Sequence, residues 1–322
     1  MLTKIKTSIK SFLGRSELNI QLSPSALVLA TYILLLITKL IDLTFINRDN
    51  EYLSVVILQM MIFLVPAAIW CRLGGERYTK GLRIRMPKAN TIPLIISAGV
   101  LMITGGILLS MLFGSLDSLS RNFSLYDTFI SKDDGTVPIK LYLILAYAVL
   151  PAICEEFVFR GILCREYERG GVARAIVISS LFFGLLHFNL QNLPVYLFAG
   201  LILSLTMYAT RSLIGAILAH LLYNLFGLFG QPYISTFYNI TASTELFIIL
   251  LGIFFLASGT VFCIQAANLY RQYLLRSHPA SYRKPVTHGF ENIRNSYLDA
   301  LLKPSAVSCY IIYVIAVIIS FI

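Results

Sequence analysis

Two adjacent carboxylates and a guanidinium lie within an apolar run of the sequence, PAICEEFVFRGIL, at residues 151–163. If the run is a helix, Glu156 and Arg160 are four residues apart with the acid on the N-terminal side, the better order for an ion pair. Glu155 is then rotated by about 100° from Glu156 and faces different neighbours. A charge at the centre of a bilayer costs roughly 2.5–3.5 kcal/mol on insertion scales, so these side chains need partners. The spacing predicts an orienting Glu156–Arg160 pair and a Glu155 carboxylate that is left for chemistry.

Small residues accompany Glu155 on its side of the predicted helix. Ala148, Pro151 and Ala152 allow another helix to approach closely. Pro151 has no N–H to donate to the carbonyl of Tyr147, which predicts a local kink or a free backbone acceptor.

Two histidines and an asparagine supply the expected partners. His187 occurs in the apolar stretch LFFGLLHFN, and His220 and Asn224 occur in GAILAHLLYN, four residues apart on one helical face. The chain has 4 histidines, and the other two, His278 and His288, lie in a basic stretch where we expect them to be solvated. Packed together with the carboxylates and the guanidinium, these side chains predict a polar cavity between helices.

A carboxylate beside an imidazole in a low-dielectric pocket can take a proton from water, and His and Asn donors can stabilise the resulting oxyanion. This combination is typical of peptide-bond hydrolysis within a membrane. Three alternatives stay open: a structural hydrogen-bonded network, a proton relay in a transporter, and a zinc site formed by Glu155, His187 and His220. The sequence has no HExxH and no GxSxG motif. The residues alone leave both possibilities open, no cofactor and zinc.

The elements that must position these residues are membrane-spanning helices. The chain of 322 residues is 57% hydrophobic and 13% charged, with a mean hydropathy of +0.77, whereas soluble chains are about 45–50% apolar and about 25% charged. The sequence therefore predicts an all-α, polytopic transmembrane helix bundle of about eight or nine spans, with a conical polar cavity open to the cytoplasmic half. The apolar segments are 25–46, 53–71, 92–114, 138–162, 174–189, 193–210, 213–230, 246–268 and 305–322.

The expected organisation follows these segments. It comprises a basic amphipathic N-terminal segment (1–24), N-terminal transmembrane helices (25–137), a catalytic core (138–230), an eighth span (231–270), a basic cytoplasmic segment (271–303) and a C-terminal span (304–322).

Lys and Arg residues alternate between connections in a way that predicts the topology. They gather in the N-terminal stretch and in the connections 72–91, 165–174 and 271–303, so we expect the N-terminus and these connections to be cytoplasmic. The net charge of +10 is then a topology signal with some attraction to lipid, and no nucleic-acid partner is expected. The 5 cysteines include no CxxC pair, which favours reduced thiols.

Counting helix rise from the cytoplasmic boundaries places Glu155 at a depth of ~8–10 Å and His187 at ~20 Å, a mismatch between two expected partners.

Three motifs, in this order and each on a predicted span, resemble those of the CPBP family. That family groups CAAX prenyl endopeptidases of the Ras-converting type with bacteriocin-processing and abortive-infection (Abi) proteins. The motifs are Glu155-Glu156-x-x-x-Arg160, Phe183-x-x-x-His187 and His220-x-x-x-Asn224. The resemblance covers residues 138–230, and the flanking spans are similar to the family only in being apolar.

The resemblance implies a role for each matching residue. Glu155 would be the catalytic base that activates water, assisted by His187. His220 and Asn224 would hold the scissile carbonyl and its oxyanion.

The Glu156–Arg160 pair would orient the site, and Phe183 would be a packing residue. The family is often labelled metalloprotease, but its chemistry resembles a metal-independent glutamate mechanism.

The favoured interpretation is an intramembrane endopeptidase in the cell membrane. Its partners would be the lipid bilayer and a membrane-associated peptide or protein substrate, of CAAX-like or peptide-maturation type. The alternatives are a non-catalytic CPBP or Abi-type scaffold or immunity factor, and a proton-coupled transporter.

Overall fold

The computed structural model describes residues 23–40, 51–75, 78–113, 139–276 and 290–320, and every regular element within them is a helix. The all-α bundle predicted from composition is confirmed. The helices at the expected apolar segments are α2 (Pro24–Leu40), α3 (Glu51–Leu73), α4 (Ile92–Phe113), a composite helix over 139–170, α10 (Val172–Leu186), α11 (Leu193–Thr210), α12 (Leu213–Phe229), α14 (Thr244–Arg276) and α16 (Pro304–Ile319). Shorter elements are η3 (Thr79–Gly81), η4 (Ala89–Thr91), α13 (Gln231–Thr241) and α15 (Phe290–Leu301). The expected amphipathic segment at the N-terminus, and His278 and His288, lie outside the described residues.

Several helices are long and apolar enough to cross a membrane. Within the described part of the chain there are 5: Val56–Leu73, Ala89–Phe113, Leu141–Gly170, Leu193–Thr210 and Thr244–Gln272. The number rises to 7 if the bent pairs α12 with α13 and α15 with α16 each count as one span, while α2 and α10 are apolar but shorter. The chain is therefore a multi-pass membrane protein, and the number of eight or nine spans stays a prediction.

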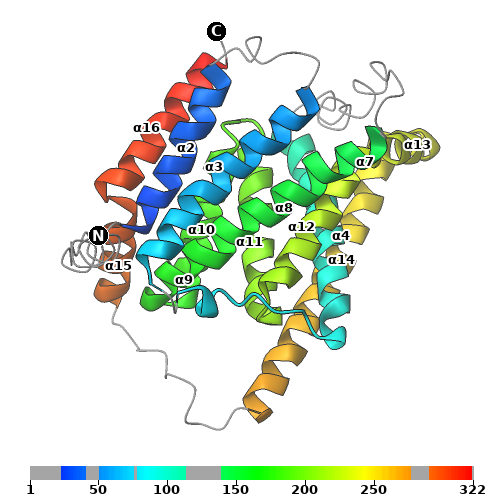
Figure 1. Cartoon of the computed structure of the whole chain (residues 1–322). Helices are drawn as coiled ribbons and strands as arrows, with labels where there is room; N and C mark the ends of the chain where they lie inside the picture. The colour runs from blue at the N-terminus through cyan, green and yellow to red at the C-terminus, as the bar shows by residue number, and fades with distance from the viewer. Residues whose placement is uncertain (1–22, 41–50, 76–77, 114–138, 277–289, 321–322) are drawn as a thin grey trace, which may run out of the picture.

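The helices that carry the candidate residues lie in the interior of the bundle (Figure 1). α12 packs against α4, α11 and the composite helix, while α10 packs along α11 and α14 lies along α4. α2 and α16, from opposite ends of the chain, lie side by side at one edge. There the hydroxyl oxygens of Ser25 and Ser305 are 2.7 Å apart, and the hydroxyl of Tyr32 donates to the carbonyl of Phe182 on α10 at 2.5 Å. The terminal helices thus cover the outer side of α10.

The composite helix contains two π-helical segments on either side of the paired glutamates. Its parts are α7 (Ile139–Leu143), π-helix η5 (Ile144–Val149), α8 (Leu150–Glu156), π-helix η6 (Phe157–Leu163), α9 (Cys164–Tyr167) and η7 (Glu168–Gly170). Because Pro151 cannot donate a backbone hydrogen bond, the sequence predicted a kink at this point. The chain responds with a π segment, in which the N–H of Leu150 donates to the carbonyl of Leu145, five residues earlier. Such π segments inside α-helices are frequent at functional sites.

The length of the composite helix corrects the predicted depths of Glu155 and His187. The helix continues to Gly170, whereas the sequence placed its end near residue 162. Glu155 and His187 therefore lie equally far along their helices from the turn between Gly170 and Val172, about 22 Å at a rise of 1.5 Å per residue. The predicted mismatch was wrong, because charged residues near the end of the helix had been assigned to a connection.

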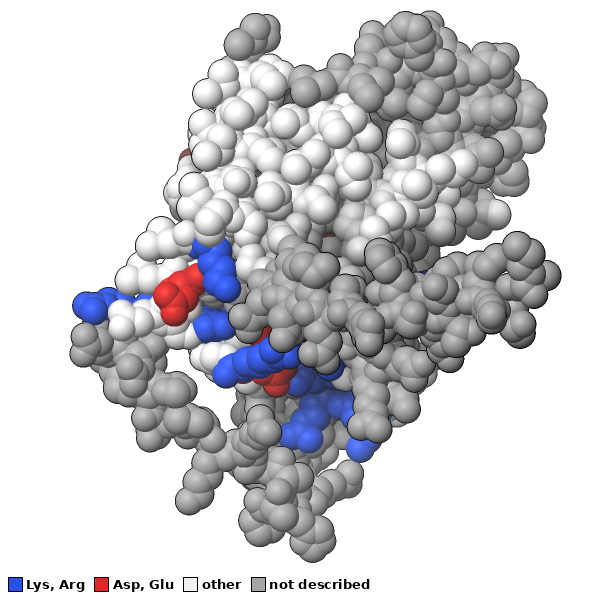
Figure 2. Space-filling view, turned by 60° about the vertical axis from the view of Figure 1, so that its left-hand side comes forward, with Lys and Arg blue, Asp and Glu red and all other residues white. Residues whose placement is uncertain are grey.

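Charged side chains gather at the end of the bundle that carries this turn. Figure 2 shows them in the lower part of one face, below described surface that is uncharged. There the hydroxyl of Tyr78 donates to Glu166 at 2.7 Å and Arg83 pairs with Glu168 at 2.7 Å. The carbonyl of Arg83 also accepts from the N–H of Leu213 at 3.0 Å. Burial and the hydrogen bond to Glu166 raise the pKa of the Tyr78 hydroxyl, which keeps it a neutral donor. These bonds fix the loop before α4 to the ends of the composite helix and α12.

Glycine at position 200 permits the close approach of α10 and α11. A Cβ atom at Gly200 would lie 3.0 Å from Cα of Ser180 and 3.2 Å from Cδ1 of Phe183. The backbone of Ser180 can move away only if the two helices separate. The same approach brings the carbonyl of Gly200 within 2.9 Å of Nη2 of Arg160.

We expect Gly200→Ala to lower the free energy of unfolding by roughly 1–3 kcal/mol, as overpacking does in close-packed interiors. The measurement is thermal unfolding of the detergent-purified protein. Gly252→Ala on α14 is the matched control, since nothing lies within 4 Å of its Cβ position. The control is expected to unfold at the wild-type temperature or slightly above it, because Ala favours the helix by roughly 0.5–1 kcal/mol over Gly. Equal unfolding temperatures for the two variants would contradict the role of Gly200.

Candidate active site

One oxygen of Glu156 is the centre of the polar cluster. Oε1 of Glu156 accepts from Nη1 of Arg160 at 2.8 Å and from Nδ1 of His220 at 2.9 Å. Glu156 is 0% exposed and Arg160 is 1% exposed, so the pair is buried. The structure confirms the ion pair predicted from the i, i+4 spacing. The sequence did not predict that His220, from a different helix, would bind Glu156 rather than Glu155.

Arg160 joins three helices through its guanidinium. In addition to Glu156 on its own helix, it donates through Nη2 to the carbonyl of Gly200 on α11 at 2.9 Å. Its Cζ lies 4.3 Å from the ring centroid of Phe183 on α10, a cation–π contact. A flat, delocalised cation suits these simultaneous contacts better than a lysine ammonium does.

Glu155 is left outside this pair, as the sequence predicted. Its Oε2 is buried and has no hydrogen-bond partner among the described residues. The carboxylate lies within range of charge interactions with His220 and Arg160, and Tyr196 lies within range of Glu155. A buried carboxylate oxygen without a donor is unfavourable in a folded protein, and such groups occur at sites that bind or react.

His187 is held at the end of α10 with one nitrogen engaged. Its Nδ1 lies 3.0 Å from the carbonyl oxygen of Phe183. A carbonyl only accepts, so Nδ1 carries the proton and the Nε2 lone pair is available. The ring stacks on Tyr196 of α11, with centroids 3.8 Å apart and an interplanar angle of 9°.

The chain turns sharply immediately after His187. Phe188 has a φ of 47°, in the left-handed region that bulky residues rarely adopt. Its ring is buried and packs edge-on against Tyr32, with centroids 5.4 Å apart, which holds the unfavourable conformation in place. Backbone strain of this kind is concentrated at functional sites, where the surrounding packing maintains it.

Phe183 packs between the two histidines. Its ring centroid lies 5.1 Å from that of His187, 5.9 Å from that of His220 and 5.4 Å from that of Phe159. The side chain is 2% exposed. The packing role predicted for this motif residue agrees with these contacts, which set the distance between the two imidazoles.

Asn224 lies one turn beyond His220 on α12 and faces the composite helix. Its Nδ2 donates to the carbonyl of Ala148 in η5 at 3.3 Å. Ala148 and Ala152 are fully buried at the contact with α12, as their small size predicted. The role of Asn224 toward an oxyanion stays a prediction.

The geometry gives the zinc alternative no support. Among the residues that the structure describes, no three His, Cys, Asp or Glu side chains are grouped so that they could hold a metal ion. Glu155, His187 and His220 therefore do not form such a group.

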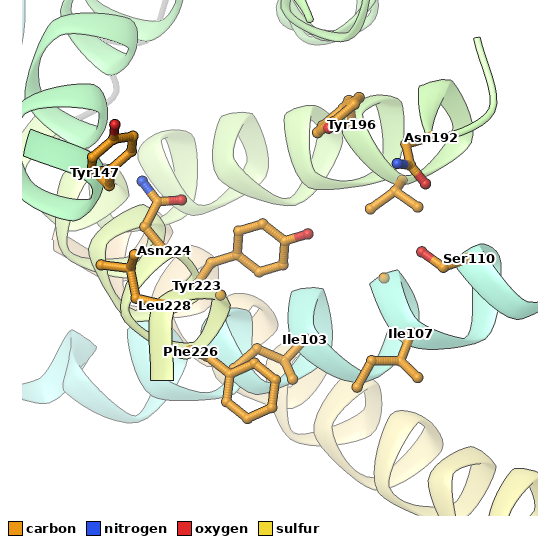
Figure 3. Close-up of a pocket in the computed structure, with 13 residues that line it drawn as sticks. Ile103, Ile107, Ser110, Tyr147, Asn192, Tyr196, Tyr223, Asn224, Phe226 and Leu228 are labelled. Carbon is orange, nitrogen blue, oxygen red and sulfur yellow. The ribbon is translucent and has the colours of Figure 1, made fainter. Parts of the chain in front are cut away.

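A cavity of about 300 Å³ adjoins the cluster, between α4, η5, α11 and α12 (Figure 3). Tyr196, which stacks on His187, and Asn224 belong to its wall. The remaining lining is apolar or glycine, and no described lining residue is charged. The polar lining residues are Ser110, Tyr147, Asn192, Tyr196, Tyr223 and Asn224.

The position of this cavity differs from the one expected. Its lining residues come from the last turns of α4 and α12 and the first turn of α11, so it lies in the half of the bundle away from the charged end. The predicted cavity open to the cytoplasmic half stays a prediction. Asn192, Tyr196 and Tyr223 were not predicted as site residues from the sequence. Asn192, a polar residue directly before an apolar segment, carried a signal, but the stacking of Tyr196 on His187 depends on helix pairing.

Comparison with known proteins supports the resemblance carried by the motifs. Residues 137–226 match the family described as Type II CAAX prenyl endopeptidase Rce1-like, and this range contains the whole polar cluster. Among curated proteins, the membrane-embedded CAAX protease MroQ of Staphylococcus aureus (strain USA300) is 28% identical over 213 residues, which cover 61% of this chain and 82% of that protein. No solved structure shows a significant match. With its motifs in order on buried helices, the core of the chain is similar to these proteases, and these similarities support the CPBP family.

Proposed function

We propose that this protein is an intramembrane endopeptidase in which Glu155 activates a water molecule. The observation that carries the proposal is the contrast between the two adjacent glutamates. Glu156 accepts through Oε1 from Arg160 and His220, although its Oε2 has no described partner. Glu155, whose Oε2 is also buried without a described partner, takes part in no ion pair among the described residues and lies near Tyr196 of the cavity wall. A purely structural network leaves this second buried carboxylate without a role, and unsatisfied buried groups are unfavourable.

In the proposed reaction, Glu155 takes a proton from water as the water oxygen bonds to the scissile carbonyl carbon. The carbonyl oxygen becomes an oxyanion, which His220 and Asn224 stabilise as donors. With Nδ1 bonded to Glu156, His220 donates through Nε2 when it is cationic, and the Glu156 carboxylate stabilises that cation.

The carbon–nitrogen bond then breaks, and the leaving amine receives the proton held by Glu155. The lone pair on Nε2 of His187 accepts a hydrogen bond that orients the water. The products are a carboxylic acid and an amine, and Glu155 returns to its carboxylate form, so the atoms balance without a cofactor.

The substrate class follows from the family and the location of the site. A membrane-associated peptide or protein, of CAAX-like or peptide-maturation type, suits a site within a helix bundle. The charged end of the bundle and the positive-inside rule support a cytoplasmic N-terminus.

We expect Glu155→Gln to reduce cleavage of a membrane-associated substrate by roughly 100-fold or more, the contribution of a positioned general base. The assay compares membrane-peptide profiles of cells that carry the wild type or the variant, followed by cleavage of an identified peptide by the purified protein. Glu245→Gln is the matched control, because Glu245 lies in the first turn of α14, far along the chain from the motifs. Full activity of Glu155→Gln would remove Glu155 as the base and favour a non-catalytic scaffold.

Arg160→Ala leaves the Glu156 carboxylate buried with one partner fewer. Breaking a buried ion pair costs roughly 3–5 kcal/mol, so we expect a lower unfolding temperature and loss of activity. The control is Arg169→Ala, whose side chain is 79% exposed and 3.7 Å from Glu166. A surface pair contributes about 0–1 kcal/mol, so this variant should behave as the wild type. Similar stabilities for both variants would contradict the organising role of Arg160.

Removal of metal ions tests the reaction class. Because the proposed steps use only protein groups and water, we expect the cleavage rate to be unchanged after incubation with a strong chelator. Loss of cleavage that returns with added zinc would replace the glutamate mechanism with the zinc alternative.

A further inference from the structure

We propose that the cavity in Figure 3 is a substrate subsite that binds an uncharged residue beside the scissile bond, and that Asn192 recognises the backbone amide of that residue. The inference rests on the proposed function and extends it to the chemistry of the substrate. It is carried by the side-chain oxygen of Asn192, which is buried without a hydrogen-bond partner among the described residues.

The Asn192 amide is buried but has an unused acceptor. The residue is 5% exposed, and its Oδ1 is buried with no hydrogen-bond partner among the described residues. Asn192 occupies the N-cap position of α11, where an Asn side chain usually accepts from a backbone N–H of the first turn. Here no such bond forms. Pro194, the second residue of the helix, has no N–H, and the side chain lines the cavity instead.

The backbone of Asn192 is fixed independently of its side chain. Its N–H donates to Oδ1 of Asn189 at 2.9 Å, and its carbonyl accepts from the N–H of Tyr196 at 3.1 Å. The backbone of Asn192 is therefore held in position while its side-chain oxygen takes no part in the turn. A buried acceptor with an unmet hydrogen bond favours a ligand that brings a donor, and an N–H is the donor present in every peptide except at proline.

The rest of the cavity selects for an uncharged side chain. Apolar atoms surround the hydroxyls of Tyr223 and Ser110, and no described lining residue could neutralise a charge. A charge brought into such a site loses its hydration without gaining a counter-ion. At about 300 Å³ the cavity lies at the small end of the range for ligand pockets, about 300–1,000 Å³, which suits one or two residues.

The cavity also leads toward the catalytic groups. In Figure 3, Asn192 and Asn224 lie at opposite ends of the lining, with Tyr223 between them. Tyr196, one turn after Asn192, stacks on His187. An extended peptide bound to Asn192 therefore runs toward Asn224 and His187, where the proposed reaction takes place.

The test measures binding of a defined probe to the full chain in lipid nanodiscs, with Glu155→Gln present so that no cleavage occurs. The probe is an N-acetylated, C-amidated tetrapeptide of Leu, Val and Phe. We expect Asn192→Ala to weaken binding by about tenfold, and to leave the unfolding temperature of the peptide-free protein unchanged or raised, because a buried unsatisfied acceptor is removed. N-methylation of the probe's central amide should weaken binding to the protein that retains Asn192. It should not weaken binding to the Asn192→Ala variant any further. A central Lys or Asp should weaken binding at least tenfold.

Two variants separate this role from general effects on the bundle. Ser204→Ala removes another buried polar side chain on α11 that does not line the cavity, so binding should be unchanged. Gly106→Ala narrows the cavity, since its Cβ would lie 3.3 Å from the Tyr223 hydroxyl and 3.4 Å from Val195. It should weaken a probe with central Phe more than one with central Ala.

The subsite would be overturned if the protein that retains Asn192 and the Asn192→Ala variant bound the probe equally, or if neither bound it. A lower unfolding temperature of the Asn192→Ala variant would also overturn it. Binding that depends on Asn192 while the wild type cleaves no peptide would support the subsite and overturn the proposed function. If the wild type cleaves a peptide but binding of the probe does not depend on Asn192, the proposed function is supported and the subsite is overturned.

Discussion

The arrangement of the site depends on one carboxylate oxygen, Oε1 of Glu156, which Arg160 and His220 share. Through these two bonds the composite helix is tied to α12, and the second guanidinium nitrogen of Arg160 extends the link to α11. Phe183 of α10 packs against both the guanidinium and the His220 ring. A buried ion pair is weak evidence for stability, because desolvation offsets its attraction. Its clearer effect here is to fix four helices in one register.

The two adjacent carboxylates have different surroundings because they lie on a short α-helical stretch between two π segments. α8 ends at Glu156, so Glu155 and Glu156 keep the α-helical rotation between neighbouring residues, and η6 begins directly after them. Carbonyls of both π segments accept side-chain donors from neighbouring helices. Phe159 accepts from the Ser179 hydroxyl at 2.9 Å, and Ala148 accepts from Asn224 at 3.3 Å. The irregular backbone is tolerated at membrane depth because neighbouring helices satisfy it.

Much of this could be predicted from the sequence, because the signals are local. Hydropathy gives the helices, and the i, i+4 rule gives the Glu156–Arg160 pair. The bond between His220 and Glu156 joins residues 64 apart in sequence, and spacing along one helix contains no information on it. The predicted depths of Glu155 and His187 failed because Arg165 and Glu166 read as a connection, although both lie on the continuing helix. There Arg165 lies over Tyr78 and Glu166 accepts from it, so neither charge needed a loop.

The charges of the cluster are matched to the proposed reaction rather than to the resting protein alone. With His220 protonated, two glutamates, Arg160 and His220 sum to zero, which lowers the cost of placing four ionisable groups inside a bilayer. When Glu155 takes a proton from water, the remaining Glu156, Arg160 and His220 carry a net positive charge. At that moment the substrate carbonyl becomes an oxyanion, and an uncharged cavity wall adds no competing counter-ion. The neutrality of the cavity and the balance of the cluster therefore serve one requirement: the single negative charge that develops in the reaction meets the one positive charge that the cluster then carries unpaired.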